Sequence, residues 1–258
     1  MTEKINLEQE EKLQLEGRNA VMEALKSGAA IDKLFVTKGE KHGSILPILR
    51  LAAEAGIVCV ETDRRKLDEM SQTEGAHQGV IASLAAAPYS TVEDILHAAE
   101  EKGEPPFLLI ADEINDPHNL GSIIRTANCV GAHGVIIPKR RSVGLTAAVA
   151  KASAGALLHT KVAKVVNLSR TIEDLKEKNI WVAALDMDGE EIYSANLTGP
   201  LAIVVGSEGN GVGTLVKKSC DFCVRLPMLG QVNSLNASVA AAVALYEAVR
   251  QRKNEKGM

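Results

Sequence analysis

Two patterns of apolar and polar positions divide the chain. From residue 107 onward, short runs that are apolar on both faces alternate with stretches of helical periodicity, as in a buried parallel sheet covered by helices. The runs expected as strands are 107–111, 134–137, 181–185, 201–205 and 223–226. A last helix is expected over 236–252, with one apolar stripe formed by Val239, Val243, Tyr246 and Val249. We therefore expect an α/β fold with a parallel sheet in the second half of the chain.

The front of the chain predicts a small α/β module of its own. Helices are expected over 18–26 and 45–55, and strands over 33–37, 57–61 and 79–84. Residues 85–106 begin with Ala-Pro and end with Gly-Glu-Pro-Pro, with a short acidic amphipathic stretch at 92–99 between, which is typical of a linker. The expected division is a charged tail at 1–14, an N-terminal module at 15–84, the linker at 85–106 and a C-terminal domain at 107–258.

Three polar, glycine-marked segments each follow an apolar run in the second half: 115–125, 206–211 and 226–238. In the first, Asn119 is a candidate cap for a helix running to about residue 130, with Arg125 just inside its positive end. A capped helix with a solvated arginine would explain this segment alone. In the third, four short polar residues lie at a helix start, and capping justifies only one or two of them; they are Asn233, Ser234, Asn236 and Ser238. The surplus suggests a ligand.

The second segment invites comparison with a dinucleotide fingerprint. Gly206, Gly209 and Gly211 give G-x-x-G-x-G, whereas that fingerprint is G-x-G-x-x-G near the start of a βαβ unit. The inverted spacing and late position disfavour a nucleotide-dependent oxidoreductase. Glu208 lies between two glycines, so a tight turn can present its carboxylate.

Taken together, the motifs resemble one known family. Residues 119–125 (Asn-Leu-Gly-Ser-Ile-Ile-Arg), 206–209 (Gly-Ser-Glu-Gly) and 235–238 (Leu-Asn-Ala-Ser) are similar to the signatures of the SpoU/TrmH family of RNA ribose 2′-O-methyltransferases, in the SPOUT class. Residues 17–21 and 77–80 resemble front-module signatures of its ribosomal-RNA guanosine branch. The resemblance covers nearly the whole chain.

This resemblance implies a site, a cofactor and a fold. The implied catalytic group is Asn119, Arg125, Glu208, Ser234 and Asn236. The implied contacts of the cofactor, S-adenosylmethionine, are Gly206, Leu226, Met228, Ser234 and Leu235. It also implies a deep trefoil knot in the C-terminal domain, an N-terminal RNA-substrate-binding module and a homodimer. The implied reaction is 2′-O-methylation of structured RNA, with a guanosine of large-subunit ribosomal RNA as target and Arg125 stabilising the developing alkoxide.

Charge permits an RNA partner without indicating one. The net charge is −4, but residues 1–104 carry 12 Lys and Arg against 19 Asp and Glu, while residues 105–258 carry 17 against 14. The dense basic cluster Lys139, Arg140 and Arg141 follows an expected strand and is either a solvated loop or a phosphate contact. Arg18 and Asn19, in the front signature, are further candidate RNA contacts, and His118 either touches substrate or is merely exposed. With seven aromatic residues and none interleaved with basic ones, we expect shape and phosphate recognition.

Other site types and locations are less favoured. Cys220 and Cys223 form a C-x-x-C with no second pair or nearby histidine, so neither a metal nor a redox centre is expected. Cys59 and Cys129 are interpreted as buried small hydrophobes. No apolar run approaches the roughly 20 residues that span a bilayer, and residues 1–16 lack a hydrophobic targeting core. We expect a cytoplasmic protein without metal or membrane partner.

Two alternatives to the ribosomal-RNA hypothesis stay open. The same chemistry could act on a guanosine of transfer RNA. A catalytically silent RNA-binding or ribosome-assembly protein could also have kept the fold, although the complete set of motif residues argues against it.

Overall fold

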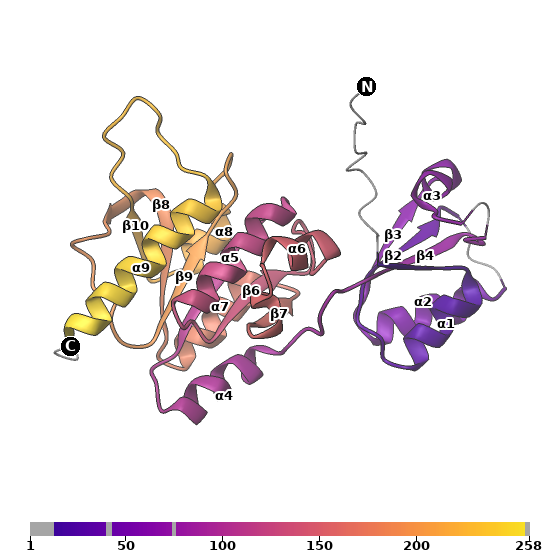
Figure 1. The fold of residues 1–258 in the computed structure, drawn as a ribbon, viewed down its shortest axis with the longest axis horizontal. Helices are drawn as coiled ribbons and strands as arrows, with labels where there is room; N and C mark the ends of the chain where they lie inside the picture. Colours follow the sequence, from indigo (N-terminus) through magenta and orange to yellow (C-terminus); the bar gives the residue numbers. More distant parts are fainter. Residues whose placement is uncertain (1–12, 40–42, 74–75, 256–258) are drawn as a thin grey trace, which may run out of the picture. The chain divides into compact units, whose positions relative to one another are not determined.

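The computed structural model describes residues 13–39, 43–73 and 76–255, so most of the expected tail at 1–14 lies outside the described residues. The chain divides into two units, which are described separately below (Figure 1). The first contains residues 1–88 and 144–148, and the second contains residues 89–143 and 149–258.

The first unit is a small α/β module built on a four-stranded sheet of order β1-β4-β2-β3. Strand β4 is antiparallel to β1 and β2, whereas β2 and β3 are parallel. Its elements are β1 (Gln14–Glu16), α1 (Arg18–Lys26), β2 (Ile31–Thr37), α2 (Ile45–Glu54), β3 (Val58–Thr62), α3 (Arg64–Met70) and β4 (Val80–Leu84). The two expected helices and three expected strands are therefore present. The additional β1 and α3 are too short to give a clear periodic signal.

The two front-module signatures meet at the start of α1. The Gly17 amide donates to the Val80 carbonyl at 3.2 Å, and Arg18 Nε donates to the Gln78 carbonyl at 3.0 Å. Gly17 has φ 86° and an added Cβ would lie 3.1 Å from the Ala76 carbonyl oxygen, so this contact requires glycine. The signatures thus hold the module together, and Arg18 is partly occupied by that role.

The second unit is built on a six-stranded parallel sheet of order β10-β8-β9-β5-β6-β7. Its strands are β5 (Phe107–Ala111), β6 (Gly134–Pro138), β7 (Lys161–Val165), β8 (Trp181–Glu191), β9 (Leu201–Val205) and β10 (Phe222–Arg225). Its helices are α4 (Val92–Lys102), α5 (Pro117–Cys129), α6 (Ala147–Ala152), a 3₁₀ turn (Ala156–Leu158), α7 (Leu168–Glu177), α8 (Thr214–Ser219) and α9 (Ala237–Glu255). The expected α/β fold with a parallel sheet is confirmed; the trefoil knot stays a prediction.

Strands β5 and β9 are buried along their whole length and lie side by side at the centre of this sheet. The chain moves outward from β5 through β6 to β7, then returns to the other side of β5 with β8 and β9. The reversal makes the carboxyl ends of β5 and β9 a topological switch point, where ligands bind in open α/β sheets.

The segment expected as a linker contains a packed helix. A capping box, in which Thr91 and Asp94 exchange side-chain and backbone hydrogen bonds, begins α4. Ile95 is fully buried against the start of β6, where an added Cβ on Gly134 would lie 2.6 Å from Ile95 Cγ1. This tertiary contact gives the short amphipathic stretch a fixed place in the second unit.

One other expectation needs correction. Cys59 and Cys129 are exposed, because each lies on the solvent side of its own element, and not buried. The apolar stripe of α9, whose direction the sequence left open, faces outward, with Val239 47 %, Val243 37 % and Tyr246 54 % exposed. The inner face of α9 is made mainly of alanines, which let the helix approach the sheet closely. Within the described residues, no helix is long and apolar enough to cross a membrane.

The half-buried carboxylate of Glu16 links β1 to the segment that follows α3 in the first unit. Glu16 accepts hydrogen bonds from Ser71 Oγ, the Gln72 amide, Thr73 Oγ1 and Gln14 Nε2 at 2.5–2.6 Å. Burial raises the pKa of Glu16, but these hydrogen bonds outweigh it and lower the pKa from 4.5 to about 2. Because the folded pKa is depressed, the stabilisation is present above pH 4.5 and is lost as the pH falls toward 2.

We expect Glu16→Gln to lower the unfolding free energy of the first unit by about 1–2 kcal/mol at pH 7. The deficit should shrink as the pH falls from about 4.5, since the wild type then loses the same charge. To measure this free energy, the full chain is equilibrated in urea at several pH values. A hydrogen-exchange pulse under one fixed condition then reports the unfolded fraction through peptides that contain β4. Glu23→Gln is the control, because Glu23 is exposed and its ion pair with Lys26 lies at the surface. A deficit that does not vary with pH would contradict the assignment.

Candidate active site

The three motif segments converge at the carboxyl edge of the parallel sheet. Ala111 pairs with Val205 in the register of β5 and β9, so the chain leaves the two strands side by side, at Asp112 just before the first segment and at Gly206, where the second begins. The third begins where β10 ends, two strands away across β8. The sequence expectation of a single site is thus matched by the placement of the segments.

Helix α5 positions Asn119, but Asn119 is not its cap. Asp116 caps the helix by accepting from the amides of His118 and Asn119 at 3.2 and 3.3 Å, and Pro117 is the first helical residue. An Asp-Pro pair suits these two positions because proline needs no hydrogen-bond acceptor there. Asn119 therefore lies in the first turn, with its side chain left for other partners.

Glycines shape the loop that follows β9. An added Cβ on Gly206 would lie 2.0 Å from the carbonyl carbon of Gly211, so the two ends of the turn touch. Ser207 and Gly211 exchange backbone hydrogen bonds of 3.1 and 2.9 Å, and Gly211 has φ 63°. This closed turn lifts Glu208 to its tip.

Asp112 fixes the far end of the same loop. Its Oδ2 accepts from the Gly213 amide at 2.8 Å, and its own amide donates to the Val205 carbonyl at 2.8 Å. Asp112 is buried, and this burial raises the pKa of its carboxyl. The loop is therefore pinned at both ends to the central strands.

Asn236 caps helix α9 and orients the second half of the site. Its Oδ1 accepts from the amides of Ser238 and Val239 at 3.0 and 3.3 Å and from Ser238 Oγ at 2.6 Å. Because a cap must present an acceptor to the helix N–H groups, the Nδ2 group necessarily faces away from the helix.

Asn119, Glu208 and Asn236 form one hydrogen-bonded cluster. Asn119 Nδ2 donates to Glu208 Oε1 at 2.8 Å, Asn236 Nδ2 donates to Asn119 Oδ1 at 2.9 Å, and Asn236 Nδ2 also donates to Glu208 Oε1. The cluster joins residues up to 117 positions apart in the chain. One residue from each motif segment is thus locked to the other two.

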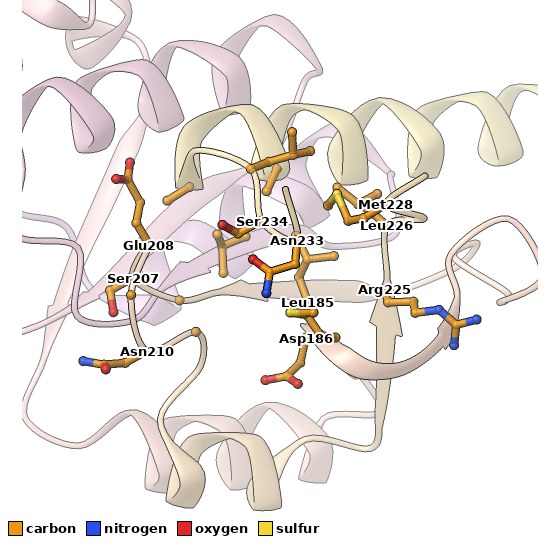
Figure 2. A pocket seen from close by; sticks show the side chains of 18 residues that line it. Leu185, Asp186, Ser207, Glu208, Asn210, Arg225, Leu226, Met228, Asn233 and Ser234 are labelled. Atoms are coloured by element: carbon orange, nitrogen blue, oxygen red, sulfur yellow. The ribbon is translucent and has the colours of Figure 1, made fainter. Parts of the chain in front are cut away.

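A cavity of about 370 Å³ adjoins this cluster, a size suited to a small molecule (Figure 2). All five residues expected to contact the cofactor line it, namely Gly206, Leu226, Met228, Ser234 and Leu235. Asn233, one of the polar residues whose surplus suggested a ligand, also lines it, and further lining residues that the sequence analysis missed include Asp186, Asn210 and Arg225. Arg225 ends β10, and Asp186 follows the apolar run 181–185 within β8, and these positions are the signal that could have indicated them.

Two expected catalytic residues stand apart from the cluster. Ser234 lines the cavity and makes no hydrogen bond within the described residues, and Figure 2 shows it beside Asn233. Arg125 is exposed, does not line the cavity, and has no hydrogen-bond or ion-pair partner in the part of the chain that the structure describes. Its guanidinium is left available for a ligand outside the cavity.

Of the expected RNA contacts, Asn19, Arg140 and Arg141 are exposed, whereas Arg18 and Lys139 are half-buried. Lys139, Arg140 and Arg141 follow β6 at the carboxyl edge of the sheet, and Arg141 pairs with Glu113 at 3.0 Å. Asn19 and His118 are exposed.

The C-x-x-C pair offers no reactive thiolate. Burial raises the pKa of Cys220 to about 12, and burial also raises the pKa of Cys223. Over residues 13–39, 43–73 and 76–255, no three His, Cys, Asp or Glu side chains gather as a metal site would require.

Comparison with known proteins gives the family. Residues 106–246 match the model of the SpoU rRNA methylase family. The chain belongs to this family. Residues 14–90 match a second model, RNA 2′-O ribose methyltransferase substrate binding. The predicted membership is confirmed, and the chain is a methyltransferase of the SpoU/TrmH family.

Relatives and solved structures agree with this placement. A Bacillus subtilis protein named as a TrmH family tRNA/rRNA methyltransferase, YacO, is 52 % identical over 238 residues, 92 % of this chain and 94 % of that one. A TrmH-family structure from Porphyromonas gingivalis is 26 % identical with TM-score 0.56, covering 94 % and 90 % of the two chains. The fold is shared with the SpoU methyltransferase AviRb of Streptomyces viridochromogenes in complex with AdoMet, at TM-score 0.59, 23 % identity and coverage of 93 % and 90 %.

We expect Asn236→Asp to separate the capping role of Asn236 from its role in the cluster. Aspartate keeps the cap but loses both donors and places a second carboxylate against Glu208. Thermal stability should stay near that of the wild type, while methyl transfer to RNA falls by about 100-fold. Asn236→Ala should lose the same activity and also about 1 kcal/mol of stability.

The control is Ser238→Ala, which removes one hydrogen bond to the same Oδ1 atom and leaves the cluster intact. Near-normal turnover by Asn236→Asp would mean that the cluster is not needed for the reaction.

Proposed function

We propose that this protein transfers a methyl group from S-adenosylmethionine to a ribose 2′-hydroxyl of structured RNA. The observation that carries the proposal is the hydrogen-bonded cluster of Asn119, Glu208 and Asn236 at the edge of the cavity. The cluster supplies a fixed carboxylate and fixed amides beside a nucleoside-sized space, and Arg125 stays exposed near it on α5.

The cofactor is S-adenosylmethionine. Backbone turns around Gly206 and Leu226 and the apolar side chains of Met228 and Leu235 suit an adenosyl group, and the lining carboxylates Asp186 and Glu208 suit a cation. When bound, the group supplies an electrophilic methyl on a sulfonium. The cavity residues hold and orient it, which aligns the methyl with the attacking hydroxyl.

Arg125 acts on the RNA side of the reaction. A ribose hydroxyl is a poor nucleophile until its oxygen is stabilised as an alkoxide. The guanidinium keeps its charge in proteins and offers several donors in a rigid fork, so it stabilises the developing oxyanion or an adjacent phosphate. Ser234, which faces the cavity, completes the polar rim between cofactor and ribose.

The proposed target is a guanosine of large-subunit ribosomal RNA. Support comes from the first unit, whose family model concerns RNA substrate binding and whose two signatures interlock around Gly17. We propose that Arg18 and Asn19 contact phosphates, together with the loop that carries Lys139, Arg140 and Arg141. A guanosine of transfer RNA is the alternative target, and a silent RNA-binding or ribosome-assembly protein is the alternative role.

Methyl transfer from labelled S-adenosylmethionine to total RNA that lacks its native 2′-O-methyl groups, with nuclease mapping, tests this proposal. We expect label on one guanosine ribose of large-subunit ribosomal RNA. Label in transfer RNA would support the proposed reaction and contradict the proposed ribosomal-RNA target. Cofactor binding with no label, on free RNA and on ribosomal precursor particles alike, would support the silent role.

Variants tested in the same assay distinguish the role of Arg125 from that of Arg140. Arg125→Ala should lower kcat by roughly 100-fold or more, with Arg125→Lys recovering little because a single ammonium lacks the fork. Arg140→Glu should raise KM for RNA and leave kcat nearly unchanged. Normal turnover by folded Arg125→Ala would remove Arg125 from the mechanism.

The active form is proposed to be a homodimer in the cytoplasm. The outer face of α9 is apolar, and Val243 and Tyr246 line a shallow hollow together with Tyr193. A helix that is apolar on its outer face as well requires a covering surface, and a second copy supplies a self-complementary one.

Val243→Glu should shift the protein from dimer to monomer in analytical ultracentrifugation, because each copy would bury a charge. Val166→Glu is the control, since Val166 is 80 % exposed on a different part of the same unit. A dimer that persists in Val243→Glu would place the interface elsewhere.

A further inference from the structure

One carboxylate in the cavity has no role in the cluster. Asp186 lies on β8, lines the cavity, and has a side chain that is only 16 % exposed. Figure 2 shows it apart from Glu208, with Ser234 and Asn233 between them in that view. A carboxylate this well covered is held in place by partners, and those partners determine what it can still bind.

Within the described part of the chain, one of its two oxygens, Oδ1, has hydrogen-bond partners. Asp186 Oδ1 accepts from Lys217 Nζ at 2.8 Å and from the Asp188 amide at 3.2 Å. Lys217 also pairs with Asp188 Oδ2 at 2.7 Å, and these hydrogen bonds raise the pKa of its ammonium, so it stays charged. The side chain of Asp186 is therefore fixed in direction.

The second oxygen is open. Asp186 Oδ2 has no hydrogen-bond partner among the described residues, and it faces Gly211, where an added Cβ would lie 3.6 Å away. Gly211 closes the turn that carries Glu208. A rigid acceptor is thus presented beside the glycine turn, on the cavity side.

The position of Asp186 selects the chemistry of its partner. The Glu208 cluster joins the loops of β5 and β9, and β8 lies one strand beyond β9 in the sheet. A ligand with its reacting group at the cluster therefore extends its other arm toward β8. In nucleotide-binding α/β sheets, an acidic residue near the glycine turn accepts hydrogen bonds from ribose hydroxyls.

We propose that Asp186 Oδ2 accepts a hydrogen bond from a ribose hydroxyl of the cofactor's adenosyl arm, which makes Asp186 a determinant of cofactor specificity. The inference rests on the proposed function, in that the cavity must hold the adenosyl cofactor. Lys217 acts as a positioning residue that holds the other oxygen.

Isothermal titration calorimetry of the full-length protein with S-adenosylhomocysteine and with its 2′-deoxy and 3′-deoxy analogues tests this inference without turnover. The wild type should bind the parent ligand roughly tenfold more tightly than at least one analogue. Asp186→Ala should weaken the parent ligand by a similar factor and remove the preference. Asp186→Asn, which keeps the shape of the side chain, is the second variant should the alanine variant not fold.

Asp188→Ala is the matched control, because it also removes one carboxylate from Lys217 but does not line the cavity. It should keep the wild-type preference. The fluorescence of Trp181, on the same strand as Asp186, reports whether β8 is intact in each variant.

The outcomes distinguish a failure of the proposed function from a failure of the role of Asp186. If the wild type does not bind S-adenosylhomocysteine, the proposed function fails and the inference fails with it. If it binds and the folded Asp186 variants keep the wild-type preference, the proposed hydrogen bond to Asp186 is refuted and the proposed function stands. Equal weakening of the parent and both analogues would also refute it, because Asp186 would then face a different donor.

Discussion

The amide of Asn236 is the interaction on which the geometry of the site depends. Its oxygen serves the N-terminus of α9, and this fixes its nitrogen toward Glu208 and Asn119. The direction of the Glu208 carboxylate is thereby set by a 19-residue helix whose inner face is buried. A carboxylate on an exposed glycine loop thereby gains the precision of a secondary-structure element.

The cluster alone could not order that loop. Fixing one residue costs about 1–2 kcal/mol of conformational entropy, whereas a typical hydrogen bond contributes about 0.5–1.5 kcal/mol. Order in residues 206–213 comes instead from the Ser207 and Gly211 pair, from the contact of Gly206 with Gly211, and from the buried carboxylate of Asp112. The side-by-side pairing of β5 and β9 places all of these, and the cluster forms on a turn that is already closed.

The sequence predicted those parts of the fold and the site whose residue pattern is distinctive by itself. Strands β5 and β9 were predictable because both faces are apolar, and the resemblance of the motifs to a known family indicated five of the residues that line the cavity. The predicted N-cap of α5, Asn119, was wrong. Asn119 and Asp116 are both good capping residues, and only the adjacent Pro117 decides between them. Helix α4 depends on the contact of Ile95 with Gly134, and β7 is a short strand with lysines at both Lys161 and Lys164, so neither gave a strong local signal.

The arrangement of charge explains how a chain of net charge −4 can serve a polyanionic substrate. Carboxylates of Asp186 and Glu208 line the cavity, which favours a cationic cofactor and repels phosphate from the same space. Arg125 and Arg140 lie exposed outside it. Because salt screens exposed charges beyond about 8–10 Å, the binding of a phosphate depends on the charges within that distance and not on the net charge of the whole chain. The placement of carboxylates at the cofactor cavity and of arginines outside it therefore matters more for binding than the net charge of the chain.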